Sequence, residues 1–216
     1  MTICVSGASG LVGNEILIQL LNRPEVEKVL VLSRSPLSLS HPRMQVALIA
    51  FEELHQIDVA EKIDAGFCAL GTTLRKAGSK TRQQQIDRDF VVAFAAFCKR
   101  SGAEKIGIVS SIGANAQSSN FYLRTKGEME QGVSDLKIPH TIFIRPSFLV
   151  GQRKEFRFGE KLLTTLSFLV NPFLFGKAKK YRSIPASKVA HNLIESTLED
   201  ASETRNSPTI ILGKID

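Results

Sequence analysis

The sequence has few of the residues from which disulfide frameworks and metal centres are built. Its three cysteines, Cys4, Cys68 and Cys98, are odd in number and far apart, and two of them lie in apolar, strand-like runs. Such cysteines are typical of buried, reduced thiols rather than of disulfides. The four histidines show no spacing typical of metal ligands. We therefore expect no metal site.

Long apolar runs are lacking as well. The N-terminal stretch MTICVSGASG has no basic region followed by a long apolar run, so we interpret it as a first β-strand and expect a cytoplasmic protein. The most apolar stretch, residues 161–175, is too short to span a bilayer and is interrupted by Asn171 and Pro172. Core packing is its preferred interpretation, and a lid, a subunit contact in an oligomer or a peripheral membrane contact are the alternatives.

Acidic residues are scarce in one segment. The formal net charge of the chain is +7. The segment from Arg145 to Arg182 contains nine basic residues and only two acidic ones, Glu155 and Glu160, so it accounts for the whole excess of positive charge. The concentration argues against a nucleic-acid-binding surface spread over the domain. It favours a local anionic partner, such as a phosphate-bearing ligand or a membrane surface, with a solvated surface as the alternative.

Short apolar runs alternate with longer amphipathic ones over most of the chain. The pattern predicts strands at residues 3–6, 28–33, 45–51, 65–70, 105–110, 140–145 and 209–212, and helices at 11–22, 81–101, around Tyr122 and at 187–198. This order predicts an α/β protein, a doubly wound parallel sheet (Rossmann fold) with helices on both faces. We expect a single domain over residues 1–216, in which residues 146–207 contribute the smaller, substrate-side part.

The first strand runs directly into a glycine-rich turn that opens a helix. Gly7, Gly10 and Gly13 form a G-x-x-G-x-x-G pattern. Glycines there allow a tight turn and a close backbone approach, so that N–H groups at a helix N-terminus meet a pyrophosphate. The strand-turn-helix context predicts a dinucleotide site, with a purely structural turn as the alternative.

The end of the second strand indicates which dinucleotide binds. An acidic residue there would accept hydrogen bonds from the ribose 2′-hydroxyl, but VLVLSRSP offers Ser33, Arg34 and Ser35. An arginine pairs with a 2′-phosphate through its fixed fork of donors. NADP(H) is therefore the predicted cofactor, and the alternative for Arg34 is an ordinary exposed loop residue.

Tyr122 and Lys126 lie one helical turn apart in the stretch NFYLRTKGEMEQ. Ser110 and Ser111 end the fifth strand, at the edge where open α/β sheets bind ligands. The lysine would favour the tyrosinate form of Tyr122, which helps proton exchange with an alcohol or carbonyl during hydride transfer. A serine hydroxyl would hold the substrate oxygen. Coincidence is the alternative explanation of the spacing.

Together these residues resemble the short-chain dehydrogenase/reductase superfamily, in its atypical branch. The stretches CALGTTLRKAG, IDRDFV, SSIGAN, SSNFYLRTKGEME and IRPSFLVGQR look like the Tat-interacting protein family of NADPH-binding oxidoreductase-like proteins, and they occur in the family order. The resemblance implies that Tyr122 is the catalytic tyrosine, Lys126 its partner and Ser111 the serine, with Ser110 as the adjacent candidate.

The resemblance also implies cofactor contacts on matching positions. These are pyrophosphate contacts at Ser9, Gly10, Leu11 and Val12, a 2′-phosphate site at Arg34 and Ser35, ribose-side contacts at Leu70 and Gly71, and late contacts at Leu149 and Arg157. The sequence departs from the family pattern at Ala50, where an acidic residue commonly stands, and at Pro146-Ser147, which replaces a frequent Pro-Gly. Asp87 takes a place often held by asparagine, and a structural role is its preferred interpretation.

The leading hypothesis is an NADPH-dependent oxidoreductase in which Tyr122 donates a proton to a carbonyl. The alternative is an NADPH-binding regulatory or scaffold protein with little or no turnover. A sugar-nucleotide epimerase is a weaker option, because little chain follows the sixth strand. The expected substrate is a small carbonyl or alcohol. The apolar stretch beside the basic residues Lys177, Lys179, Lys180 and Arg182 would suit an amphipathic anion such as an acyl thioester.

Overall fold

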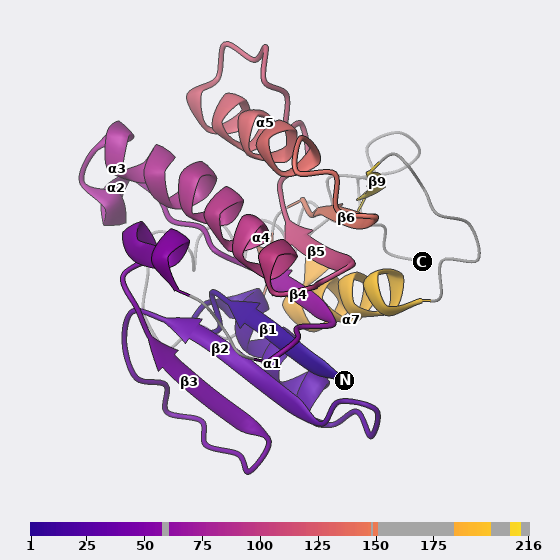
Figure 1. The fold of residues 1–216 in the computed structure, drawn as a ribbon. Coiled ribbons are helices and arrows are strands. Elements are labelled where there is room, and N and C mark those ends of the chain that lie inside the picture. Colours follow the sequence, from indigo (N-terminus) through magenta and orange to yellow (C-terminus); the bar gives the residue numbers. More distant parts are fainter. Residues whose placement is uncertain (58–60, 148, 151–183, 200–207, 213–216) are drawn as a thin grey trace.

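The computed structural model describes residues 1–57, 61–147, 149–150, 184–199 and 208–212 (Figure 1). In these ranges the main element is a seven-stranded parallel sheet with the order β3-β2-β1-β4-β5-β6-β9. Its strands are β1 (Thr2–Ser6), β2 (Lys28–Ser33), β3 (Met44–Leu48), β4 (Ala65–Cys68), β5 (Lys105–Val109), β6 (His140–Arg145) and β9 (Thr209–Leu212). The short strands β7 (Leu149–Val150) and β8 (Ile184–Pro185) form a separate parallel pair.

The central strands are apolar on both faces, as expected of a parallel sheet covered by helices. In β1, Ile3 and Val5 point into one buried cluster, and Cys4 points into the other. The chain starts in the middle of the sheet, moves outward to β3, and then returns past β1 to β4. The loops that follow β1 and β4 therefore leave the sheet in opposite directions, which creates a switch point where ligands of such sheets bind.

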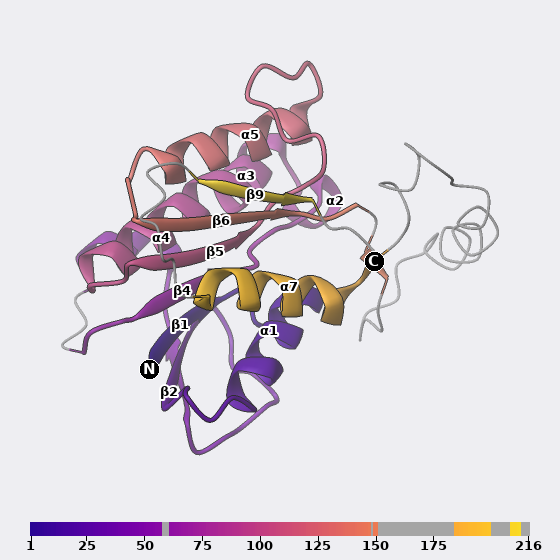
Figure 2. The ribbon, with the colours of Figure 1, turned by 90° about the vertical axis from the view of Figure 1, so that its right-hand side faces the viewer.

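Helices cover both faces of the sheet, so the predicted doubly wound fold is confirmed. Helices α1 and α7 lie together on one face, and α4 and α5 lie on the other (Figure 2). The helices are α1 (Leu11–Leu21), α2 (Leu74–Ala77), α3 (Lys80–Gln84), α4 (Phe90–Arg100), α5 (Phe121–Ser134) and α7 (Ala186–Leu198).

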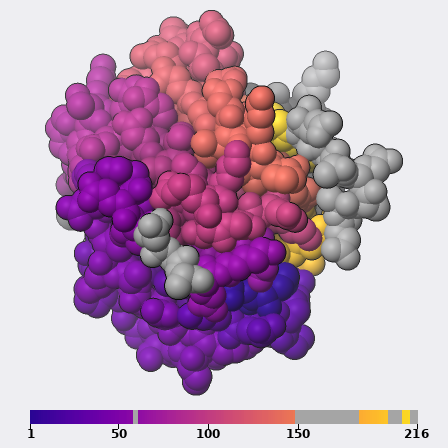
Figure 3. All heavy atoms as spheres, in the orientation of Figure 1, coloured from indigo at the N-terminus to yellow at the C-terminus, as the bar shows by residue number. Residues whose placement is uncertain are grey.

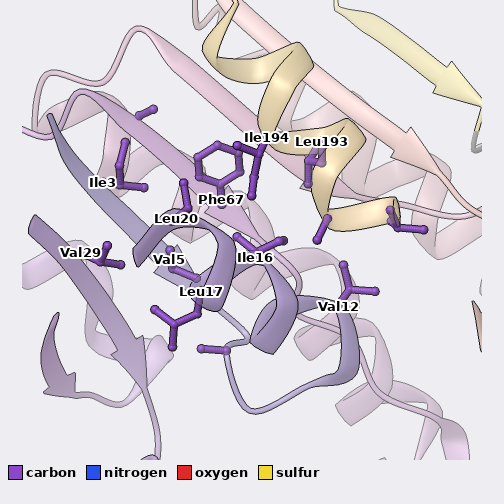
Figure 4. Packing of buried hydrophobic residues seen from close by; sticks show 14 of the residues in the cluster. Ile3, Val5, Val12, Ile16, Leu17, Leu20, Val29, Phe67, Leu193 and Ile194 are labelled. Carbon is purple, nitrogen blue, oxygen red and sulfur yellow. The ribbon is translucent and has the colours of Figure 1, made fainter. Parts of the chain in front are cut away.

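The core on the α1 and α7 face is centred on a buried phenylalanine of β4. Side chains of Ile16 and Leu20 from α1 and of Leu193 and Ile194 from α7 gather around Phe67 (Figure 4). All five are buried. This packing joins an element near the start of the chain to one near its end.

The opposite face is closed by helices α4 and α5 (Figure 3). The third strand ends earlier than expected, at Leu48, and a 3₁₀ helix (Phe51–Gln56) follows. The ring of Phe51 stacks on Phe90 of α4, with 5.5 Å between the centroids, and Leu54 is buried beside it. The apolar end of this stretch therefore packs on a helix rather than extending the sheet.

The predicted helix over residues 81–101 is divided into three segments. Between α3 and α4 lies a π-helical turn (Gln85–Asp89), in which Ile86 and Asp87 are buried. A π-helical turn carries an extra residue per turn, and such turns are frequent at functional sites. Here it places a carboxylate inside the protein, next to the end of the sheet that carries the switch point.

The part of the chain that the structure describes was expected to contain neither a metal site nor a membrane-spanning helix. No group of histidine, cysteine and carboxylate side chains there could hold a metal ion. No helix there is long and apolar enough to cross a membrane. The three cysteines are free and buried.

Removing the side chain of Phe67 should destabilise the fold strongly. Phe67→Ala is expected to lower the free energy of unfolding by about 3–5 kcal/mol, because it deletes buried surface and leaves a cavity between α1 and α7. Leu48→Ala, at an exposed position on the edge strand β3, should change it by less than about 0.5 kcal/mol. Chemical denaturation of both variants measures the difference, and equal losses would contradict this account of the core.

Candidate active site

The loop between β1 and α1 is packed backbone against backbone. Gly7 has a φ of +79°, and a Cβ there would lie 2.5 Å from the carbonyl carbon of Ala69, in the loop after β4. A Cβ on Gly13 would lie 2.0 Å from the Gly7 oxygen. Only glycine fits both positions, since any side chain would collide with main chain that cannot move aside.

The same loop presents the N-terminus of α1 at the switch point. Gly10 caps the helix without any side-chain hydrogen bond, and its N–H donates to the Gly7 carbonyl at 2.9 Å. Ser9 and Gly10 are exposed, while Val12 is buried in the core beneath. The exposed N-terminus is a favourable place for an anion such as a pyrophosphate.

Arg34 and Ser35 follow β2, the strand that pairs with β1. The Ser33 hydroxyl donates to the Ser35 carbonyl at 2.7 Å and accepts from the Ser35 N–H at 3.3 Å. These bonds form a tight turn with Arg34 exposed at its tip. Within the described residues the Arg34 guanidinium makes no hydrogen bond or ion pair, so it is available to a bound phosphate.

The loop after β4 connects the glycine loop to Lys126. Ala69 contacts Gly7, as described above, and two residues later a Cβ on Gly71 would lie 3.4 Å from Asp87 Oδ1 and 4.0 Å from Lys126 Nζ. Asp87 accepts the Thr72 N–H at 2.7 Å. Burial raises the pKa of the Asp87 carboxyl, and the nearby Lys126 ammonium acts in the opposite direction. Asp87 thus anchors the loop, the structural role preferred for it from sequence.

Helix α5 begins where the Asn120 side chain accepts the Leu123 N–H at 3.1 Å. Tyr122, Lys126 and Glu130 then follow at four-residue intervals, which places them on one helix face. Their exposed fractions are 37%, 3% and 7%. This face therefore runs from the protein surface at the phenol to the interior at the glutamate.

The two candidate serines have different surroundings. Ser110 is buried, and its hydroxyl donates to Glu130 Oε1. Ser111 is partly exposed, and its hydroxyl makes only a long contact of 3.4 Å to the Ile112 carbonyl. The Ser110 hydroxyl is thus hydrogen-bonded inside the protein, whereas the Ser111 hydroxyl is partly open to solvent.

Glu130 is a buried carboxylate that sequence reasoning missed. It accepts two hydrogen bonds from Arg145 at the end of β6, from Nε at 2.9 Å and from Nη2 at 2.5 Å. This pairing raises the pKa of the Arg145 guanidinium. Glu130 therefore ties α5 to the ends of β5 and β6 at once. Its four-residue spacing from Lys126 was the signal that could have identified it.

Two of the predicted cofactor contacts are not among the residues that meet at this site. Leu149 lies in β7, outside the main sheet. Arg157, the apolar stretch 161–175 and the basic residues 153–182 lie outside the described residues. Of the two departures noted above, Ala50 precedes the 3₁₀ helix, and the Pro146 carbonyl accepts the Ile112 N–H at 3.0 Å, which connects the loops after β5 and β6.

Comparisons with known proteins identify the family of the chain. A family model described as NAD(P)H-binding matches residues 7–199. The chain belongs to this NAD(P)H-binding family. Its relatives include FMP52-1 of Scheffersomyces stipitis, 34% identical over 94% of this chain and 92% of that protein, and HTATIP2 of Rattus norvegicus, 35% identical over 74% of this chain and 68% of that protein. These relatives are consistent with the predicted atypical short-chain dehydrogenase/reductase resemblance.

Solved structures show the same fold at low sequence identity. One is MoeE5 in complex with UDP-glucose and NAD, with a TM-score of 0.72 and 14% identity over 98% of this chain and 75% of that one. Another is a short-chain dehydrogenase family protein from Francisella tularensis, with a TM-score of 0.67 and 13% identity over 98% and 97% of the two chains. At these identities the likeness establishes the fold alone.

The expectation of a cytoplasmic protein is wrong. FMP52 relatives from Scheffersomyces stipitis, Candida glabrata, Candida albicans and Coccidioides immitis are all named mitochondrial. The expectation rested on the lack of a secretory signal pattern, and that lack argues only against secretion. It carries no information on the choice between cytosol and mitochondria.

Breaking the buried pair of Glu130 and Arg145 should be costly. Glu130→Gln or Arg145→Met alone is expected to lower the free energy of unfolding by about 3 kcal/mol, because each leaves a buried group without its partner. The double variant should lose less than the sum of the single losses. Glu128→Gln on the same helix removes a more exposed pair with Arg88, 2.8 Å long, and should cost about 0.2–1 kcal/mol. Additive losses would show that the pair is not coupled.

Proposed function

We propose that the protein is an NADPH-dependent oxidoreductase that transfers hydride to or from a carbonyl or alcohol substrate. One observation carries the proposal. The loop after β4 touches the glycine loop at Ala69 and reaches Lys126 at Gly71. A dinucleotide seated on Gly7 and the N-terminus of α1 would therefore extend towards the helix face that carries Tyr122 and Lys126.

The residues around the site fit such a cofactor. The glycines of the β1 loop leave room for a pyrophosphate, and the N-terminus of α1 favours its negative charge. Arg34, exposed and unpaired within the described residues, suits the 2′-phosphate that distinguishes NADPH from NADH. When bound, NADPH supplies the hydride.

The chain supplies the proton and the orientation of the substrate. Tyr122 donates its phenolic proton to the carbonyl oxygen as hydride adds to the carbonyl carbon, which yields the alcohol. The buried Lys126 ammonium stabilises the tyrosinate that forms. The Ser111 hydroxyl donates a hydrogen bond to the same substrate oxygen and orients it, and Ser110 holds Glu130 rather than the substrate.

Calorimetric titration with NADPH and NADH tests the cofactor. The wild type should bind NADPH more tightly than NADH. Arg34→Ala should weaken NADPH binding by roughly 10- to 100-fold, the value of a charge-assisted hydrogen bond to phosphate, and leave NADH binding unchanged. NADH is thus the internal control, since it lacks the 2′-phosphate. Equal affinity of the wild type for both nucleotides would exclude a 2′-phosphate contact at Arg34.

A screen of aldehydes and ketones for NADPH oxidation tests turnover. Tyr122→Phe should lower kcat by about 10²- to 10⁴-fold, the usual contribution of a positioned acid, without changing NADPH affinity. Gln131→Ala changes an exposed residue farther along the same helix and serves as the control. Tight NADPH binding without oxidation by any carbonyl would overturn the oxidoreductase proposal and leave a regulatory binding protein.

A further inference from the structure

The loop after β4 is unusually basic where it borders the candidate active site. Residues 69–82 contain four basic side chains and no acidic one: Arg75, Lys76, Lys80 and Arg82. The stretch includes α2 and the first three residues of α3, and it lies at the end of the sheet towards which the strands point (Figure 2). We call residues 69–82 the basic rim.

The basic rim connects two parts of the site. It begins at Ala69 and Gly71, next to the glycine loop and Lys126. Near its other end, Lys80 Nζ lies 5.6 Å from the ring centroid of Phe121, the residue before Tyr122. The rim therefore passes from the cofactor side of the site to the start of the helix that carries the phenol.

The basic rim is held in a defined conformation by side-chain caps. The Thr73 hydroxyl accepts the Lys76 N–H at 3.4 Å, and the Ser79 hydroxyl accepts the Arg82 N–H at 3.1 Å. Gly78 ends α2 with a φ of +78°. The carboxylate of the buried Asp87 accepts a hydrogen bond from the Thr72 N–H. Side chains on α2 are thus presented from a fixed backbone, which favours binding because less order has to be acquired.

Arg75 of α2 is exposed and has no hydrogen-bond or ion-pair partner within the part of the chain described here. The neighbouring Arg82 differs, since its guanidinium donates to Glu52 at 2.8 Å and to Gln85 at 2.6 Å. Among the described arginines, Arg34 also has no hydrogen-bond or ion-pair partner, and the proposed function assigns it to the 2′-phosphate of the cofactor. The remaining ones donate hydrogen bonds within the protein: Arg23, Arg43, Arg88, Arg100, Arg124 and Arg145.

The residue before Arg75 in α2 carries an exposed apolar side chain. Leu74 is 46% exposed, one of the few large apolar side chains on the described surface. An arginine next to an exposed leucine offers a carboxylate or phosphate its counter-ion and offers an adjoining alkyl group apolar contact. We infer that the site takes an amphipathic anion, a carbonyl compound whose anionic group pairs with Arg75 and whose alkyl part covers Leu74. The inference rests on the proposed oxidoreductase function.

Calorimetry with dead-end ligands tests the inference without turnover. Octanoate should bind the NADP⁺-loaded protein about tenfold more tightly than octanamide, its neutral counterpart, because only the anion forms a charge-assisted pair. Arg75→Gln should remove this preference, and Arg75→Lys should restore part of it. Leu74→Ser should weaken octanoate binding about threefold through lost apolar contact. Lys62→Gln, which alters an exposed lysine just before β4, should leave octanoate binding unchanged.

The outcomes separate this inference from the proposed function. Equal binding of octanoate and octanamide, or binding of neither, by a protein that binds NADPH and reduces neutral carbonyls would overturn the inference alone. Weaker NADPH binding by Arg75→Gln would assign the arginine to the cofactor instead and would also overturn it. Absence of NADPH binding by the wild type would contradict the proposed oxidoreductase function itself.

Discussion

The arrangement of the site depends on one contact, in which the backbone of Gly7 lies against the backbone of Ala69. Without a side chain at Gly7, the loops after β1 and β4 meet at the switch point of the sheet. The first loop leads into the exposed N-terminus of α1, and the second reaches Lys126 and Asp87. The proposed cofactor site and the proposed proton-transfer site are neighbours because two parallel strands end side by side.

Buried charges then hold in place the helix face that carries Tyr122 and Lys126. Glu130 receives Arg145 from β6 and Ser110 from β5, so α5 is attached to both strand ends by one carboxylate. Asp87 secures the loop after β4 and lies near the buried Lys126 ammonium. Such groups are expensive to bury, and they persist where each finds partners of opposite charge or hydrogen-bond donors. Here those partners lie around the helix that carries Tyr122, the proton donor in the proposed reaction.

Most of the fold could be predicted from local patterns. The strands follow from short apolar runs, and the glycine turn follows from its place between a strand and a helix. The errors occurred where a distant element decided the local structure. The third strand ends early because Phe51 stacks on Phe90, and the long helix contains a π-helical turn around the buried Asp87. Neither partner can be recognised in the neighbouring sequence.

The sequence by itself determined the order of strands and helices, the glycine turn and the spacing of Tyr122 and Lys126, because each depends on residues a few positions apart. The tertiary structure alone decided that the buried Ser110 donates to Glu130, twenty residues along the chain, while the hydroxyl of Ser111 stays partly exposed. It likewise decided that Arg75 has no hydrogen-bond or ion-pair partner among the residues that the structure describes, while Arg82 is paired with Glu52. Both distinctions depend on contacts between segments that only folding brings together, so no local pattern contains them.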